Sequence, residues 1–389
     1  MKKKSKIFKR SKNPGVALFI LLTSLIVLSL LIKDLMQTSS VQANRARNAA
    51  DRIQALYTAR TATNLARIFL IFDAFMDKQN KANASDSIND LWNQALPFPV
   101  PIKAIQSFMQ QMQGDNVVTP QDDSAESVDN EDIMKKCEDF FADFNGEATA
   151  KTTDLSSLLY LNYMNDIDDP KQDNFNTLLA LLSPNDDFRR ALSARNLNPE
   201  TIVRQIRDYA DADDFDESKS PENLPYLSMR LDYGPKNRIF TNLDELKLVP
   251  IVDDELFDYL SHYVSAFKNS PGMPPRAKPG KINLNTVSKD LFQALLTIPG
   301  SEEMAERFIK DRQEKKTIYT EANFSSLLKE KFGLEKTDIR TNLLTGISDA
   351  FKIETDATVN QVQLRLETFI PRTPGQSKVE PPALVRVSP

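Results

Sequence analysis

Two hydrophobic patterns follow each other at the start of the chain. Val16 to Ile32 has no charged residue, and as a helix it would rise about 25 Å, close to the roughly 30 Å hydrocarbon core of a bilayer. Ser39 to Lys78 has no proline or glycine, and apolar residues recur there at helical spacing. This stripe comprises Ala46, Ala50, Ile53, Tyr57, Leu65, Phe69, Phe72 and Met76. We predict one long helix, with a transmembrane part (16–32) and an amphipathic part (33–78); an anchor joined to a separate core helix is the alternative.

The pattern changes several times beyond this helix. Residues 79–164 contain strand-like pieces, interrupted by an acidic, polar segment (114–132) that has little to bury and is predicted to be disordered. Residues 165–335 show mainly helical spacing, and 336–389 return to alternation, with Val362, Leu364 and Leu366 on one face. The order predicts an α+β fold: a long N-terminal helix packed on a small antiparallel sheet, with a large helical domain inserted into the sheet.

Charge divides the chain sharply. Residues 1–15 carry seven cations and no acid, whereas the remaining 42 cations and 54 acids give the rest a formal charge of -12. A body so acidic repels phosphate backbones, which argues against general nucleic-acid binding. The basic residues keep the amino end on the cytoplasmic side of a membrane, so the body is expected on the far side.

Single residues limit the chemistry. Cys137 is the only cysteine, so the chain can form neither an intrachain disulfide nor a zinc site of several thiolates. His262 is the only histidine, so any Ser/His/Asp or Cys/His hydrolase would have to use it. It lies in a predicted amphipathic helix, where we expect a structural or surface role, and an anchored hydrolase is kept as an alternative.

Three interpretations fit the amino terminus. A secretion signal could be cleaved near Ser39 to Ala43, although two charged residues separate the apolar run from that site, and a plain anchor also fits. The third explains more: a basic leader, Gly15 and then an apolar run from Val16 resembles the leader of type IV prepilins and pseudopilins. That resemblance implies cleavage between Gly15 and Val16 by a prepilin peptidase, after which the apolar helix is retained.

One position departs from the prepilin pattern. Most members of that class have a glutamate at the fifth mature residue, where this chain has Ile20. A carboxylate inside a bilayer needs a compensating partner, which in the family is thought to be the amino group of a neighbouring subunit. The resemblance therefore implies a subunit without such a neighbour, at the tip of a filament.

A second resemblance lies in 280–312, which is similar to a helix-hairpin-helix unit. Such units bind DNA phosphates through exposed backbone amides and nearby cations. Here Glu302 and Glu303 occupy the mouth of the hairpin. We therefore expect no nucleic-acid partner, and a membrane-anchored DNA receptor remains only as an alternative.

Several segments together resemble one family. They are the Gly15 leader without its glutamate, "IRDYADADD" (206–214), "TNLDELKLV" (241–249) and "INLNT" (282–286). In this order they resemble the general secretion pathway protein K (GspK) family, the minor pseudopilins of type II secretion systems. The resemblance implies a non-enzymatic, single-pass inner-membrane subunit with a periplasmic body, which caps the pseudopilus tip with minor pseudopilins I and J. A minor pilin of a type IV pilus is the alternative.

An acidic run marks a candidate metal site. Asp208, Asp211, Asp213, Asp214, Asp216 and Glu217 fall within ten residues. Calcium takes several oxygen ligands at about 2.4 Å, and the family resemblance implies calcium in the helical domain. The spacing is not that of an EF-hand, a second acidic segment lies at 165–174, and a solvated acidic loop is the alternative.

Overall fold

The structure is a computed structural model. It describes residues 14–79, 85–93, 95–98, 146–164, 173–183, 192, 197–216, 218–267, 280–372, 382 and 384–388. The basic residues of the leader, the acidic segment 114–132, Cys137 and Glu217 lie outside the described residues.

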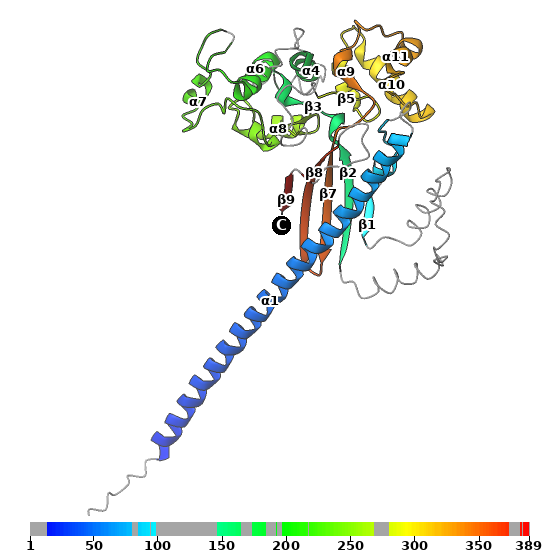
Figure 1. Cartoon of the computed structure of the whole chain (residues 1–389). Coiled ribbons are helices and arrows are strands. Elements are labelled where there is room, and N and C mark those ends of the chain that lie inside the picture. Colours follow the sequence, from blue (N-terminus) through cyan, green and yellow to red (C-terminus); the bar gives the residue numbers. More distant parts are fainter. Residues whose placement is uncertain are drawn as a thin grey trace, which may run out of the picture.

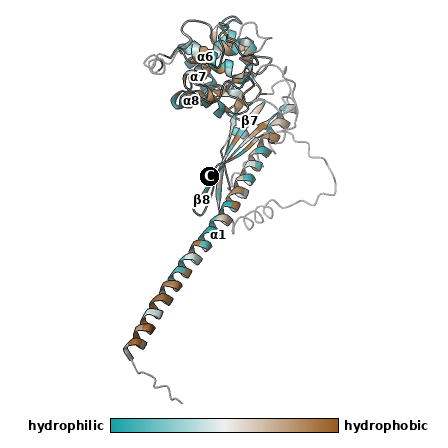
Figure 2. Ribbon diagram, turned by 90° about the vertical axis from the view of Figure 1, so that its left-hand side faces the viewer, coloured by the Kyte–Doolittle hydropathy of each residue, from teal (hydrophilic) through white to brown (hydrophobic). Residues whose placement is uncertain are grey.

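A single helix, α1, dominates the N-terminal part. It runs without interruption from Pro14–Gln79, 66 residues, a length of roughly 100 Å (Figure 1). The prediction of one long helix is confirmed. Its apolar side chains are exposed over the first part, which is coloured brown at the free end in Figure 2. By length and composition, α1 is apolar enough to cross a membrane.

An antiparallel sheet packs against the second half of α1. Its strands are β1 (Leu96–Phe98), β2 (Glu147–Asp154), β7 (Ala350–Val359), β8 (Val362–Pro371) and β9 (Leu384–Ser388), in the order β1-β2-β7-β8-β9. A two-residue turn joins β7 to β8, and Asn360 adopts the positive φ of 52° that such turns require. Leu364 and Leu366 are buried on one face of β8, as the alternation predicted.

The face that α1 turns to the sheet is lined mainly by small residues. The buried positions are Ala55, Ala59, Ala62, Ala66, Phe69, Leu70 and Ala74, which we call the alanine face. Small side chains let the helix lie close to the strands, and Thr63 is hydrogen-bonded to Thr355 of β7 at 2.8 Å. The predicted stripe is therefore wrong in part, because Ile53 and Tyr57 are 58% and 62% exposed on the opposite side.

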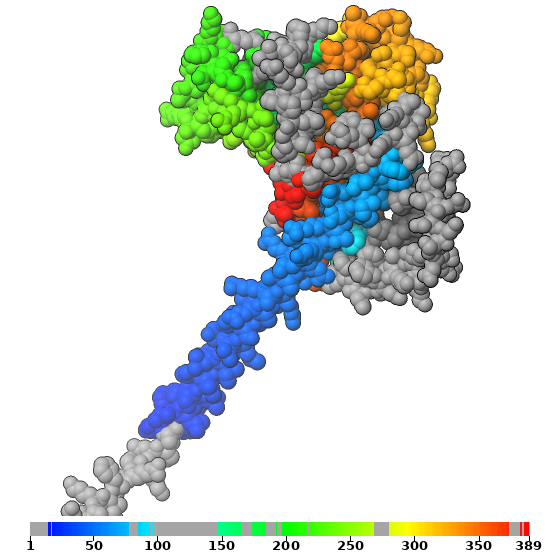
Figure 3. Space-filling view, viewed as in Figure 1, coloured from blue at the N-terminus to red at the C-terminus, as the bar shows by residue number. Residues whose placement is uncertain are grey.

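A helical body is inserted between β2 and β7. Its helices are α4 (Asp173–Leu181), α6 (Pro199–Ala210), α7 (Leu224–Ser228), α8 (Asp254–Ser261), α9 (Lys289–Leu295), α10 (Ser301–Lys315) and α11 (Phe324–Phe332). Short 3-10 turns also occur: η1 (Leu91–Asn93), η2 (Leu155–Ser157), η3 (Leu161–Tyr163), η4 (Leu243–Leu248) and η5 (Thr341–Leu343). The predicted α+β class is confirmed. In Figure 3, α1 forms a stalk and the helical body lies at the other end of the molecule from the stalk's free end.

The helical body begins earlier and ends later than the predicted 165–335. β3 (Leu159–Tyr160) pairs in parallel with β4 (Val264–Ser265), and β5 (Ile282–Asn283) pairs in parallel with β6 (Leu344–Thr345). These two-residue pairs belong to the body and not to the five-stranded sheet, and Leu159 and Leu344 lie in its core. The sequence pattern of these segments is that of strands, but their apolar side chains fill the core of the helical body.

A buried polar network joins the body to the sheet. Asn283 of β5 donates from Nδ2 to the Asp86 carbonyl at 2.8 Å and to Ser348 Oγ at 2.8 Å. Asp154, at the end of β2, accepts from Ser348 Oγ at 2.6 Å and from Thr286 Oγ1 at 2.5 Å. The "INLNT" segment thus contacts the end of β2 and the segment after α1.

Candidate metal centre and assembly surface

The candidate metal centre is built at the carboxyl end of α6. This helix starts at Asn198, whose side chain accepts from Glu200 N, with Pro199 in the first turn. Ile202, Val203, Ile206 and Tyr209 form its buried face. The helix ends at Ala210 and Asp211 is its C-cap, so Asp208 and Asp211 lie one turn apart.

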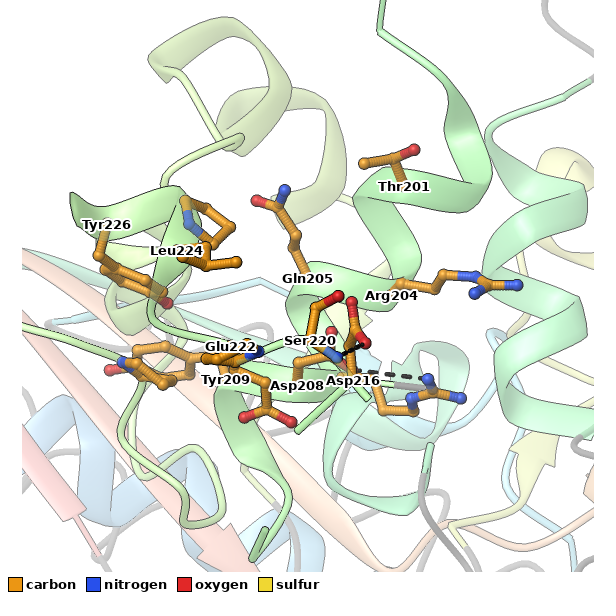
Figure 4. Close-up of a pocket in the computed structure, with 14 residues that line it drawn as sticks. Thr201, Arg204, Gln205, Asp208, Tyr209, Asp216, Ser220, Glu222, Leu224 and Tyr226 are labelled. Carbon is orange, nitrogen blue, oxygen red and sulfur yellow. Dashed lines mark hydrogen bonds and ion pairs between the residues drawn. The ribbon is translucent and has the colours of Figure 1, made fainter. Parts of the chain in front are cut away.

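Three carboxylates converge there. Asp208, Asp211 and Glu222 each offer one oxygen, and these oxygens all lie within 4.8 Å of one another. Ligands of one calcium ion at about 2.4 Å cannot be farther apart than about 4.8 Å, so a single ion could contact all three. Asp208 and Glu222, together with Asp216, line a pocket of about 220 Å³ (Figure 4).

The pocket contains polar atoms that the protein itself leaves unsatisfied. Glu222 is 6% exposed, and neither of its carboxylate oxygens has a hydrogen-bond partner among the described residues. The same holds for Gln205 Oε1 and the Tyr226 hydroxyl. Burial, followed by the charges of Asp211 and Asp208, raises the pKa of Glu222 to about 8. Oxygen donors without partners in an acidic pocket suit a hard cation.

The structure brings together only part of the predicted acidic run. Asp213 and Asp214 are exposed; Asp213 Oδ1 accepts from Phe215 N at 3.1 Å, and Asp214 Oδ1 accepts from Asn237 Nδ2 at 2.8 Å. Asp216 lines the pocket but its Oδ1 accepts from Ser220 N at 2.8 Å. Glu217 lies outside the described residues.

Sequence reasoning missed Glu222. The chain turns back on itself through a bridge between Phe215 and Pro221, and Glu222 N donates to the Asp214 carbonyl at 3.2 Å. This turn brings Glu222 close to Asp208 and Asp211. No regular spacing in the sequence predicts this proximity. In the second acidic segment, Asp173 is described; it contacts Arg340, with 3.8 Å between Nε and Oδ1, and Asn342.

The predicted cleavage site lies in the first turn of α1. A Cβ added at Gly15 would meet no atom within 4 Å, and Val16 is 56% exposed. Packing among the described residues therefore gives no reason for a glycine at this position.

Among the described residues, His262 makes no hydrogen bond to a serine hydroxyl or to a carboxylate side chain. It is exposed at the end of α8, and its Nδ1 lies 2.7 Å from the Asp258 carbonyl. Ser261 Oγ donates to that same carbonyl at 2.7 Å, and Asp244 is paired with Arg386 at 2.6 Å. The three groups line one cleft of about 340 Å³, but each is engaged elsewhere.

The hairpin-like unit serves the core. Phe292 of α9 and Phe308 of α10 stack with their ring centroids 3.8 Å apart. Lys289 lies 3.8 Å from Glu302 and 3.4 Å from Glu306, so its charge is shared by acids at the hairpin mouth. This arrangement offers a phosphate backbone little attraction.

An apolar surface runs along α1 on the side away from the sheet. It comprises Ile53, Tyr57, Ile68, Ile71 and Phe75, which are 41–62% exposed and which we call the outer stripe. The intervals between them keep to one side of a helix, opposite the alanine face. Large apolar residues on a solvent-exposed face are typical of a surface that another protein covers.

Part of the helical body matches a known protein family. Residues 157–269 match the family described as type II secretion system protein K, and this segment contains α4, α6, α7 and α8. This part of the helical body is therefore similar to the protein K family. The candidate metal centre, from Asp208 to Glu222, lies inside this protein K segment, whereas the "INLNT" segment follows it.

One curated relative also carries this name. It is the type II secretion system protein K of Pectobacterium carotovorum subsp. carotovorum, 29% identical over 149 residues. The match covers 37% of this chain and 41% of that relative, so the alignment spans less than half of either protein.

The likeness in fold to a solved structure extends well beyond the protein K segment. The chain is similar to one in the crystal structure of the GspK-GspI-GspJ complex from the type II secretion system of enterotoxigenic Escherichia coli, with a TM-score of 0.58. That match covers 89% of this chain and 99% of the other at 17% identity, which is a likeness of fold.

Proposed function

We propose that the chain is a minor pseudopilin of a type II secretion system, which occupies the tip of the pseudopilus and helps to start its assembly. The observation that carries this proposal is the division of α1 into two faces. The alanine face holds the chain's own sheet, and the outer stripe is left for other subunits. The protein K family match and the fold likeness support the same conclusion.

The shape of the molecule favours a terminal position. A filament grows by head-to-tail contacts and continues only while both faces of each subunit are available. The helical body projects beyond the sheet at the end of α1 that is distant from the apolar segment (Figure 3). A subunit with such a body can receive neighbours along its helix below the body, whereas the body obstructs addition above it.

Membrane placement follows from the amino terminus. We propose that a prepilin peptidase cuts between Gly15 and Val16 on the cytoplasmic face and that 16–32 remains in the inner membrane. The cluster of basic residues before Gly15 supports a periplasmic location of the body. The role is assembly and not catalysis, in keeping with the engaged state of His262.

The partners are proposed from the complex with the similar fold. That complex contains GspI and GspJ, and we propose that the corresponding minor pseudopilins of this chain's own system contact the outer stripe. Tyr57 and Ile53 lie where the stripe begins, next to the part of α1 that leaves the sheet. Aromatic and aliphatic side chains of this kind commonly carry most of the energy of an interface.

Calcium is the proposed ligand of the metal centre. Asp208, Asp211 and Glu222 would supply the charged ligands, and water would supply the remaining oxygens. A bound ion would fix the turn after α6 to the helix end, and so stabilise this side of the body.

The assembly proposal is tested by co-purification. The full chain is expressed with the minor pseudopilins I and J of its system, extracted in detergent and purified through a tag on I. We expect a ternary complex, which Ile53→Ser combined with Tyr57→Ser disrupts without changing the thermal midpoint of the isolated chain. Met229→Ser, at an exposed apolar site on the helical body, is the control and retains the complex.

The outcomes separate the alternatives. Recovery with type IV pilus subunits in place of I and J would assign the chain to a pilus, and salt-sensitive binding of duplex DNA would favour a DNA receptor. Amino-terminal sequencing of the membrane-extracted protein should give Val16; a start at Met1 or Asn44 in cells with active prepilin peptidase would refute the processing step.

The calcium proposal has its own assay. We expect calcium to raise the thermal midpoint of the full chain relative to chelator, and Glu222→Gln to abolish most of this rise. Asp232→Asn, at an exposed acid of the helical body outside the pocket, should leave it unchanged. Equal calcium responses in the wild type and Glu222→Gln would remove Glu222 from the site.

A further inference from the structure

A second group of carboxylates lies where α1 ends, far along the chain from the first. Asp73 and Asp77 come from the last turns of α1, and Asp86 and Asp90 from the segment before η1. Asp73, Asp77 and Asp86 pair with Arg372, which follows β8, and Asp90 lies beside Asp73 and Asp86. We call these five residues the Arg372 cluster.

The single cation of this cluster is fully engaged. Arg372 Nη1 lies 2.8 Å from Asp73 Oδ2, and Nη2 lies 2.6 Å from Asp86 Oδ2 and 3.1 Å from Asp77 Oδ2. With every group ionised, four carboxylates and one guanidinium carry a net charge of -3. The side chain of Arg372 is only 2% exposed, so solvent does little to screen this excess.

Asp86 provides the decisive observation. It is fully buried, and its Oδ2 accepts from Arg372 and from Ser348 N at 2.7 Å. Its other oxygen, Oδ1, is buried and has no hydrogen-bond partner among the described residues. A buried carboxylate oxygen without any donor is costly, and nothing described in the chain offsets that cost.

The remaining geometry defines where a ligand would lie. One oxygen each from Asp73, Asp86 and Asp90 lies within 4.8 Å of the other two, the span that ligands of one calcium-sized ion cover. Asp90 is held in place by Ser87, whose N donates to Oδ2 at 2.6 Å and whose Oγ donates to Oδ1 at 3.0 Å. A carboxylate oxygen that accepts one hydrogen bond still has a lone pair for a cation.

We propose that Asp73, Asp86 and Asp90 form a second divalent-cation site, suited to a calcium-sized ion, which fastens the end of α1 to the segment before η1. The ion takes the side of Asp86 opposite to Arg372 and reduces the net charge of the cluster from -3 to -1. The side chains of Asp73 and Asp77 are 12% and 18% exposed, so the cluster reaches the surface and water can complete the coordination.

The acidity of the cluster agrees with this assignment. Asp73 lies more than forty residues beyond the apolar segment of α1, against the folded sheet. Burial, with the charge of Asp86 next, raises the pKa of Asp73, and burial raises that of Asp90. A bound cation would offset the mutual repulsion of these buried carboxylates.

Trp92 gives the proposed site a reporter of its own. It is the only tryptophan of the chain, is two residues from Asp90, and packs edge-on against Phe351 with centroids 5.0 Å apart. Terbium resembles calcium in ionic radius and in its preference for oxygen ligands. It emits light when a nearby indole is excited. Excitation at the red edge of indole absorption avoids the tyrosines near Glu222.

The test uses the full chain in detergent, with terbium as the probe and calcium as competitor. We expect tryptophan-sensitised emission in the wild type and in Glu222→Gln, which calcium displaces and which Asp90→Asn reduces at least tenfold. Asp232→Asn, at an exposed acid of the helical body, is the matched control and keeps the emission. Calorimetric titration of Glu222→Gln with calcium should give one site, and Glu222→Gln with Asp90→Asn none.

Two results would overturn the proposal. One is no tryptophan-sensitised emission from the folded wild-type chain, which would leave the cluster neutralised by protons alone. The other is that Asp90→Asn changes neither the terbium emission nor the number of calcium ions bound. If Asp90→Asn fails to fold, the displacement of terbium by calcium is compared in the wild type and in Glu222→Gln. Displacement in both proteins supports the site, and its absence in both contradicts it.

Discussion

Asn283 offers the sharpest test of how the helical body is attached to the sheet. The perturbation is Asn283→Ala at a fully buried position of β5. It removes the donor to the Asp86 carbonyl at 2.8 Å and the acceptor of the Asn285 N–H at 2.9 Å. Ser348 Oγ keeps its bond to Asp154, so two backbone groups lose their partner.

The expected magnitude follows from these two groups. A buried polar group left unsatisfied costs about 1–3 kcal/mol, so the substitution should lower the free energy of unfolding by roughly 2–6 kcal/mol. That is a large part of the roughly 5–15 kcal/mol that stabilises an ordinary protein. Asn64→Ala, at an exposed position of α1, should change it by less than about 0.5 kcal/mol.

The assay is urea unfolding of the full chain in detergent, followed by Trp92 fluorescence for the sheet and by far-ultraviolet circular dichroism for the helices. Asn283→Asp adds a sharper arm, because it places a second carboxylate beside Asp154, whose Oδ2 lies 3.3 Å from Asn283 Nδ2. It should destabilise more at neutral than at acid pH. A loss below about 1 kcal/mol for Asn283→Ala would show that this network does not hold the junction.

Three further predictions concern other parts of the molecule. Ala59→Leu overpacks the alanine face and should cost about 1–3 kcal/mol in thermal unfolding, whereas a comparably stable variant would contradict the close helix–sheet contact. Phe308→Ala removes a fully buried ring that stacks on Phe292 and should cost about 3–5 kcal/mol in urea unfolding; a loss under 1 kcal/mol would contradict this packing. Without calcium, the raised pKa of Glu222 means that the folded state retains a proton that the unfolded state loses, so its contribution to stability falls as the pH rises from about 4.5 to about 8. Glu222→Gln should flatten that part of the pH profile measured in chelator, and an unchanged slope would exclude this residue as its source.

The elements of the fold could largely be predicted from the sequence, because long-range packing decides little about them. No proline or glycine interrupts α1 after Gly15, and alternation in β8 places Leu364 and Leu366 on one face. The orientation of α1 could not be predicted in the same way. The stripe predicted from periodicity combines the exposed Ile53 and Tyr57 with the buried Phe69, because periodicity follows large apolar residues and gives the alanine face little weight.

The sites depend on contacts that no local pattern records. Asp208 and Asp211 are close because they lie one turn apart at the end of α6, and this much follows from sequence. Glu222 reaches them only through a turn. Arg372 contacts Asp73 across almost the whole chain, and two-residue pairings such as β5 with β6 are too short for any periodicity.

The register of the sheet sets the order in which the chain can fold. Glu147 of β2 pairs with Thr358 of β7, and the entire helical body lies between them. The pairing of β2 with β7 therefore cannot form until that body has been synthesised. A compact body lowers the loop-closure entropy that is lost when the two strands come together. Until then the alanine face has no partner, so a defect in the body should appear first as protease cutting within the second half of α1.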